Sequence, residues 1–161
     1  MLSQEEVKKI VLPVLEKKGT RYKKTKNVFA RKAKKNEQIT TATSDGNETI
    51  RKAKEGDYIV RNQTEAQEEY IVSPKKFRKR YTYKKRSKGS FNEYEPKGKV
   101  IAVEVTKSVL KKFNLSSEFH FEAPWGSKMV VKENDFLVRQ LDNDRVYRIA
   151  RKEFFETYQR M

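Results

Sequence analysis

Hydrophobic residues follow a helical period at the start of the chain. They recur every three or four positions from Val7 onwards, which places them on one face of a helix. Ser3, followed three positions later by a glutamate, forms a capping-box pattern that marks a helix start, and Gly19 is a natural helix end. We therefore predict an N-terminal helix over residues 1–18 that docks by one apolar face. Pro13 should bend or end this helix, because its ring and its missing N–H strain the preceding turn.

The rest of the chain repeats one pattern of strands. The string "EGDYIVRN" (55–62) matches "ENDFLVRQ" (133–140) in charge and hydrophobicity, and "EEYIVSPKKFRKRYT" (68–82) aligns with "RVYRIARKEFFETYQ" (145–159). Each copy reads strand, turn, strand, short helix. In each helix two aromatic residues stand four positions apart, so they share one helical face. We interpret the doubled pattern as an internal duplication.

Further patterns add elements upstream in each copy. "NVFARKA" and "KVIAVEV" predict a first strand in the first and second copy, respectively. Hairpins are expected to turn at "SDGN" (44–47) and at "PWG" (124–126). "TKSVLKKFNL" (106–115) predicts a helical turn in the second copy only.

Together these patterns predict an α+β fold, with an N-terminal helix followed by two related small antiparallel β modules that each end in a short helix. The expected boundaries are 1–18 for the helix, 19–84 for the first module with its basic C-terminal helix, 85–98 for a linker and 99–161 for the second module. The glycine, proline and charge of the third segment indicate an exposed connection. Residues 20–27, which are basic and aperiodic, are expected to form a loop.

The first copy resembles an uncharacterised group of bacterial and phage proteins known by the string "PGDYG". The matching residues are Gly56, Asp57, Tyr58, Pro74, Phe77 and Tyr81. Glu55 and Ile59 stand where the string has proline and glycine, and the second copy keeps only Asp135, followed by Phe136. The resemblance covers 55–82 and more loosely 133–159. It supports the module interpretation and implies no chemistry.

Composition excludes several classes of protein. Cysteine is absent, so disulfides and thiolate chemistry are excluded. The N-terminus lacks the pattern of a signal peptide, and no stretch approaches the roughly 18 apolar residues of a membrane span. We therefore expect a cytoplasmic protein.

Charge points to a partner. The formal net charge is +16, and nearly all of the excess lies in two blocks: residues 17–35 hold ten Lys or Arg and no acid, and residues 73–99 hold eleven basic and two acidic residues. Such blocks attract polyanions, and lysines in particular make phosphate contacts with little sequence preference. The expected phosphate-contacting residues are Lys23, Lys24, Lys26, Lys75, Lys76, Arg78, Lys79, Arg80, Lys84, Lys85 and Arg86. Tyr22, Tyr83 and Trp125 are candidates for stacking on bases.

The leading hypothesis is therefore a non-catalytic nucleic-acid-binding protein of low sequence specificity, with RNA and DNA both open. The same basic faces also fit a solvated surface, a targeting or membrane-surface role, or a phage or bacterial accessory module that docks on an acidic protein. A carboxylate-based enzyme acting on nucleotides or nucleic acid is a third hypothesis. Its candidates are Asp57 and Asp135, which we expect to cap turns, and His120, which we expect on the surface. We expect no catalytic residue, metal site or cofactor, and the oligomeric state stays open.

Overall fold

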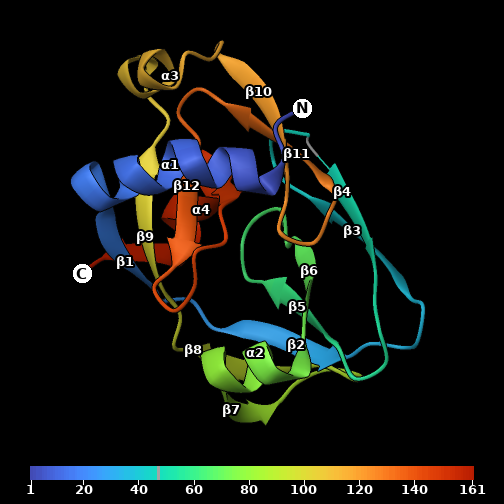
Figure 1. The fold of residues 1–161 in the computed structure, drawn as a ribbon. Helices are drawn as coiled ribbons and strands as arrows, with labels where there is room; N and C mark the ends of the chain where they lie inside the picture. Colours follow the sequence, from blue (N-terminus) through green and yellow to red (C-terminus); the bar gives the residue numbers. More distant parts are fainter. Residues whose placement is uncertain (47) are drawn as a thin grey trace. The chain divides into compact units, whose positions relative to one another are not determined.

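The structure is a computed structural model that describes residues 1–46 and 48–161 (Figure 1). Its helices and mainly antiparallel strands form an α+β fold, as predicted. The chain divides into two units, each built from segments that are distant in sequence. Unit 1 comprises Met1–Tyr22, Lys99–Phe154 and Arg160–Met161, and unit 2 comprises Lys23–Gly98 and Phe155–Gln159.

Unit 1 contains most of a five-stranded sheet and a separate hairpin. The sheet has the order β13 (Tyr147–Ile149), β12 (Phe136–Gln140), β9 (Lys99–Glu104), β1 (Thr20–Lys24) and β14 (Tyr158–Arg160). The hairpin pairs β10 (Glu118–Glu122) with β11 (Lys128–Lys132), and its turn at residues 124–126 was predicted. Its helices are α1 (Gln4–Lys18) and α3 (Lys107–Phe113), and α4 (Arg151–Thr157) begins in it.

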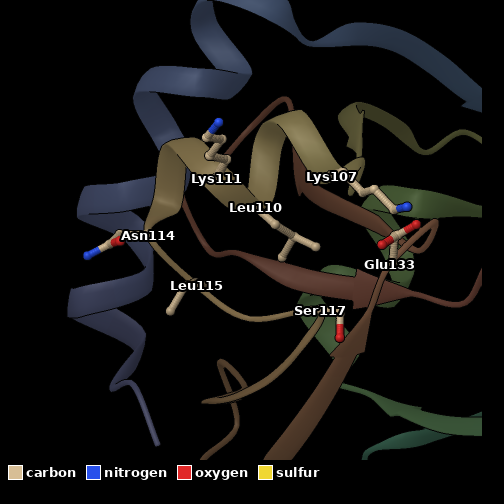
Figure 2. Close-up of a pocket in the computed structure, with 7 residues that line it drawn as sticks. All are labelled: Lys107, Leu110, Lys111, Asn114, Leu115, Ser117 and Glu133. Atoms are coloured by element: carbon tan, nitrogen blue, oxygen red, sulfur yellow. The ribbon is translucent and has the colours of Figure 1, made fainter.

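Helix α3, predicted in the second copy only, joins β9 to β10. Its inner face buries Val109, Leu110 and Phe113 in the core of unit 1. Its outer side borders an open hollow of about 430 Å³ (Figure 2), which is lined by Lys107, Leu110, Lys111, Asn114, Leu115, Ser117 and Glu133.

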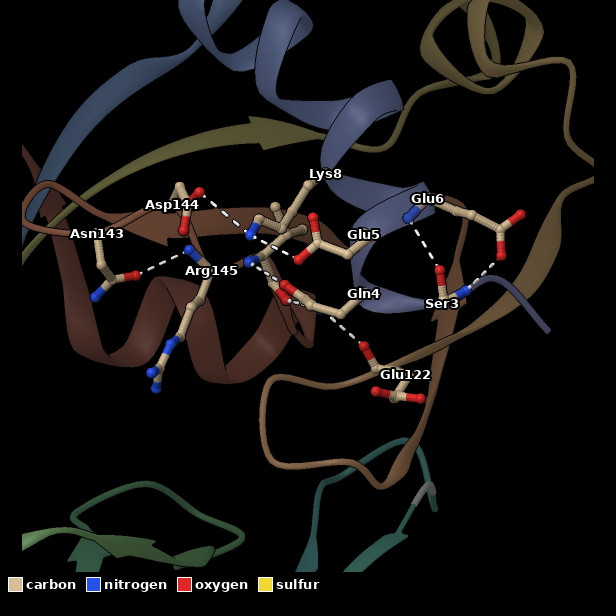
Figure 3. Close-up of polar contacts among 10 residues, drawn as sticks. Ser3, Gln4, Glu5, Glu6, Lys8, Glu122, Asn143, Asp144 and Arg145 are labelled. Carbon is tan, nitrogen blue, oxygen red and sulfur yellow. Dashed lines mark hydrogen bonds and ion pairs between the residues drawn. The ribbon is translucent and has the colours of Figure 1, made fainter.

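Helix α1 is fixed to unit 1 at its first turn. The predicted capping box is present, because the hydroxyl of Ser3 accepts the N–H of Glu6 and the Glu6 carboxylate accepts the N–H of Ser3 (Figure 3). The side-chain amide of Gln4 accepts the N–H of Val146 and donates to the carbonyl of Glu122. The apolar face of the helix then enters the same core as α3. The N-terminal helix therefore belongs to a unit core and is not a separate segment.

Unit 2 has a sheet of the same size. Its order is β6 (Glu69–Val72), β5 (Tyr58–Asn62), β2 (Val28–Lys32), β8 (Asn92–Pro96) and β7 (Tyr81–Arg86). Helix α2 (Pro74–Arg80) covers one face, where Phe77 stacks on Tyr58 at 3.9 Å between ring centroids. The hairpin of β3 (Gln38–Ala42) and β4 (Glu48–Lys52) packs Ile39 against Ile59 on the other face. The predicted turn at 44–47 includes residue 47, which lies outside the described residues.

The two units share specific geometry. Strands β6, β5 and β2 occupy the same places in one sheet as β13, β12 and β9 in the other. The stacked pair Phe77–Tyr58 has a counterpart in Phe154–Phe136, also at 3.9 Å. The fourth strands also hold corresponding places: β8 lies between β2 and β7, and β1 lies between β9 and β14. Strand β8 follows β7 along the chain, whereas β1 joins strands that are distant in sequence.

Two segments differ from expectation. Residues 20–24 form β1 instead of a loop, and the expected linker at 85–98 contains the end of β7 and all of β8. The strands were missed because β7 is an edge strand whose residues after Tyr81 are exposed, so it lacks the apolar alternation of a half-buried strand. The charges and glycines of this segment belong to a hairpin and not to a connection between domains.

Pro13 does not end α1, which continues to Lys18. The proline is exposed, while Val11 and Leu15 on either side are fully buried. Burial of the apolar face thus offsets the hydrogen bond that Pro13 cannot donate. No helix in the described part of the chain is long and apolar enough to cross a membrane.

Candidate nucleic-acid interface

The basic residues 75–86 of the second block lie on α2 and on strand β7, which directly follows it in unit 2 (Figure 1). Because Phe77 anchors the inner side of α2, the residues on its outer side point to solvent. Lys75, Arg78 and Lys79 are exposed, and Lys76 and Arg80 are half-buried. We call α2 and β7 together the α2–β7 surface.

Strand β7 continues this surface along the sheet edge. Lys84, Lys85 and Arg86 are all exposed. Basic residues on an edge strand also prevent strand addition by other chains, so their presence alone does not imply a ligand. Lys84 lies 3.7 Å from Glu93 and 4.0 Å from Glu95, so its charge is partly balanced within the unit.

Tyr83 stands at the outer end of a row of aromatic rings. Its ring meets Tyr94 edge-on at 5.7 Å, and Tyr94 meets the buried Phe77 at 4.7 Å. Burial raises the pKa of Tyr94, which fits its place inside the row. Tyr83 itself is 53% exposed, so its ring is held from one side and open on the other. The stacking role expected of Tyr83 is compatible with this position.

Lys24 was expected to contact phosphates, but its side chain is only 9% exposed. Its Nζ donates to Asn62 Oδ1 at 2.9 Å, to the Tyr70 hydroxyl at 2.6 Å and to the Tyr81 hydroxyl at 3.2 Å. Both tyrosine rings also lie within 5.5 Å of this nitrogen. All three ammonium protons are therefore used inside unit 2, so Lys24 belongs to its interior and not to the exposed basic surface.

Other residues of the first block differ in their surroundings. Lys23 and Lys26 are exposed, and Lys26 donates to the carbonyl of Gln63 at 3.5 Å. Arg31 forms a two-pronged ion pair with Glu37, at 3.0 and 2.5 Å. This contact and the N–H of Lys34 lower the pKa of Glu37 to about 2. Part of the positive charge of this block is therefore balanced by a carboxylate within unit 2.

Two stacking candidates lie in unit 1. Tyr22 is half-buried, and its ring packs edge-on against Phe154 at 4.8 Å and Phe136 at 6.5 Å. Its ring serves internal packing and is not an exposed platform as expected. Trp125 sits in the β10–β11 turn and is 36% exposed.

Asp57 and Asp135 have the turn role that we expected. Each carboxylate accepts a backbone N–H three residues earlier, from Lys54 at 2.8 Å and from Lys132 at 2.9 Å. Asp135 also forms a buried ion pair with Arg148 at 2.9 Å. Within the described residues, no group of three or more His, Asp or Glu side chains is arranged to hold a metal ion.

Sequence reasoning missed a second aromatic–cation cluster on unit 2. The guanidinium of Arg61 lies 4.2 Å from the centroid of Phe91, and that of Arg31 lies 5.5 Å away. Both arginines are ion-paired, Arg61 with Glu69 and Arg31 with Glu37. These residues are far apart in sequence and follow no shared spacing, so no sequence signal marks the cluster. Because both charges are balanced, it serves packing.

Comparison with known proteins identifies no relative: no family model, curated protein or solved structure matches the chain.

Proposed function

We propose that this protein binds nucleic acid without catalysis, through phosphate contacts from the α2–β7 surface and with low sequence specificity. The observation that carries the proposal is the outward projection of Lys75, Arg78 and Lys79 from a helix whose inner side is held by Phe77. Basic residues on two adjoining elements provide the continuous positive field that a polyphosphate chain requires.

The corresponding helix of the other copy offers an internal comparison. When the two halves are aligned, Lys75, Arg78 and Lys79 correspond to Lys152, Phe155 and Glu156 of α4. Both helices keep the inward phenylalanine, at 3% and 0% exposure. The outward charge of α2 is therefore not required by the fold, which supports a role in binding.

We also propose that the two units arose by duplication of one module. The equal strand orders, the two stacked aromatic pairs and the two aspartate turns support it. The likeness of residues 55–82 to PGDYG-type proteins stays a proposal that rests on the shared residues. In this interpretation α3 was added to one copy, and the basic face of α2 was added to the other.

Fluorescence anisotropy with labelled single-stranded and duplex oligonucleotides, over a salt series, tests the nucleic-acid proposal. We expect affinity to fall steeply with salt, because each phosphate contact releases counterions. A triple variant in which Lys75, Arg78 and Lys79 are each replaced with Gln should bind duplex DNA with a less steep dependence on salt. The magnitude of the slope of log K against log salt should decrease by roughly 3.

A matched control removes the same charge elsewhere on unit 2. Lys32, Lys34 and Lys35 are exposed and lie outside the α2–β7 surface. Their replacement with Gln should change the slope much less. Equal losses in both triple variants would indicate a diffuse effect of net charge. Absence of binding by the wild type at low salt would overturn the proposal and favour docking on an acidic protein.

A further inference from the structure

A β-bulge in β7 decides which basic residues share a face with Tyr83. Tyr83 pairs with Tyr94, but the next pairs are Lys85 with Glu93 and Arg86 with Asn92, so the register shifts by one residue at Lys84. Without the shift, Lys85 would follow Tyr83 on the same side of the strand, because side chains alternate. The bulge instead brings Arg86 to that side.

The faces follow from the pairing. Residues directly opposite each other in antiparallel strands point to the same face. Tyr94 belongs to the core under α2 and pairs with the buried Val28, and Asn92 pairs with the buried Ala30. Tyr83 and Arg86 therefore lie on the sheet face that α2 covers. Lys85 lies on the opposite face with Glu93.

The two faces of the sheet also differ in the charge of the residues that β8 contributes. On the α2 face, β8 contributes Asn92, Tyr94 and Pro96, which are all uncharged. On the opposite face it contributes Glu93 and Glu95, and Lys84 lies within 4.0 Å of both. Tyr83 and Arg86 thus lie on a face to which β8 adds no carboxylate, whereas Lys84 lies near Glu93 and Glu95 and Lys85 shares the face of Glu93.

The shape of this face disfavours a duplex. Helix α2 has only seven residues, which is about two turns, and Phe77 holds it flat on the sheet. A helix this short offers few side chains to the base edges of a major groove. An exposed ring beside cations is instead the arrangement that stacks an unpaired base and holds the neighbouring phosphates.

We propose that the α2–β7 surface selects single-stranded nucleic acid, with a base stacked on Tyr83 and a phosphate held by Arg86 and not by Lys85. This inference rests on the proposed function and adds the ligand class and the contacting residues. Tyr94 holds the Tyr83 ring in place before binding, which reduces the entropy lost when a base stacks.

The test compares neighbouring residues of equal charge. Arg86→Gln should weaken binding of a labelled single strand about tenfold or more, whereas Lys85→Gln should change it less than twofold. Tyr83→Ala should weaken single-strand binding by roughly 10–100-fold and duplex binding little, and Tyr83→Phe should retain it. An oligonucleotide with 2-aminopurine reports stacking directly, because its fluorescence should be quenched by the wild type and Tyr83→Phe but not by Tyr83→Ala.

The outcomes separate this inference from the function on which it rests. Thermal melting establishes that each variant is folded at the assay temperature. Wild-type binding with equal effects of Lys85→Gln and Arg86→Gln, or unchanged binding by Tyr83→Ala, would overturn the inference and leave the proposed function standing. Failure of the wild type to bind either oligonucleotide would overturn the proposed function itself.

Discussion

At the residue scale, Lys24 illustrates how a lysine within a basic run is used by the core. It lies in the run of ten basic residues at 17–35, yet its ammonium group is enclosed by Asn62, Tyr70 and Tyr81. The hydroxyls of Tyr70 and Tyr81 also lie 2.8 Å apart, so they form a hydrogen bond with each other as well as with the lysine. Composition places such a residue on the surface, and only the fold reveals the polar cavity that holds it.

We predict that Lys24→Ala lowers the free energy of unfolding by roughly 2–4 kcal/mol, because it removes three hydrogen bonds from a largely buried polar cluster and leaves space behind. Denaturant unfolding measures the change. Lys23→Ala is the control, since Lys23 is exposed and should change stability by less than about 0.5 kcal/mol. Oligonucleotide affinity of folded Lys24→Ala should match the wild type. A large loss of affinity with unchanged stability would contradict the structural role.

Glu37 links stability to acid pH. Its pKa is lowered from 4.5 to about 2 in the folded state, first by Arg31 and then by the N–H of Lys34. A depressed carboxylate pKa stabilises the fold above the unfolded value, and this contribution is lost as pH falls from about 4.5 towards 2. We predict that Glu37→Gln lowers stability at pH 7 and flattens this part of the stability profile. Urea unfolding at several pH values tests it, and parallel profiles for variant and wild type would contradict it.

At the element scale, the sequence predicted the helices and strands that bury apolar residues and missed strands that carry exposed charges. The period of α1, the strands β2 and β9, and helices α2 to α4 all follow from apolar spacing. Strands β1, β7 and β8 carry charges on exposed positions, so their pattern resembles a loop. The basic character of the α2–β7 surface could also be predicted. The bulge that places Arg86 and Lys85 on opposite faces of β7 could not be predicted, because it depends on how β7 pairs with β8.

The end of α1 depends on a glycine for space and not for an unusual backbone angle. Gly19 has φ −66°, which any residue adopts, but a Cβ there would lie 2.3 Å from the Leu15 carbonyl oxygen and 2.6 Å from Ile101. We predict that Gly19→Ala destabilises the protein by about 1–3 kcal/mol through overpacking. Glu16→Ala, on the exposed side of the same helix, should be close to neutral. Equal unfolding midpoints for both variants would contradict the close contact.

At the scale of the whole molecule, a single cut near the middle of the chain removes an inner strand from each five-stranded sheet. Cutting the chain between Lys88 and Gly89 separates β7 from β8. Fragment 1–88 then lacks β8, which lies between β2 and β7, and fragment 89–161 lacks α1 and β1, which lies between β9 and β14. A strand removed from within a sheet leaves two rows of backbone N–H and C=O groups without partners.

We therefore predict that neither fragment folds alone and that mixing them restores a 1:1 complex with the native fold. Circular dichroism of each fragment and of the mixture, with size-exclusion chromatography, measures this. The mixture should reproduce the spectrum of the intact chain and elute as one species. A folded, monomeric fragment 1–88 would contradict the expectation. It would indicate that β1 can take the place of β8 in the sheet of its own half, which the duplication proposal allows because β1 and β8 hold corresponding places in the two sheets.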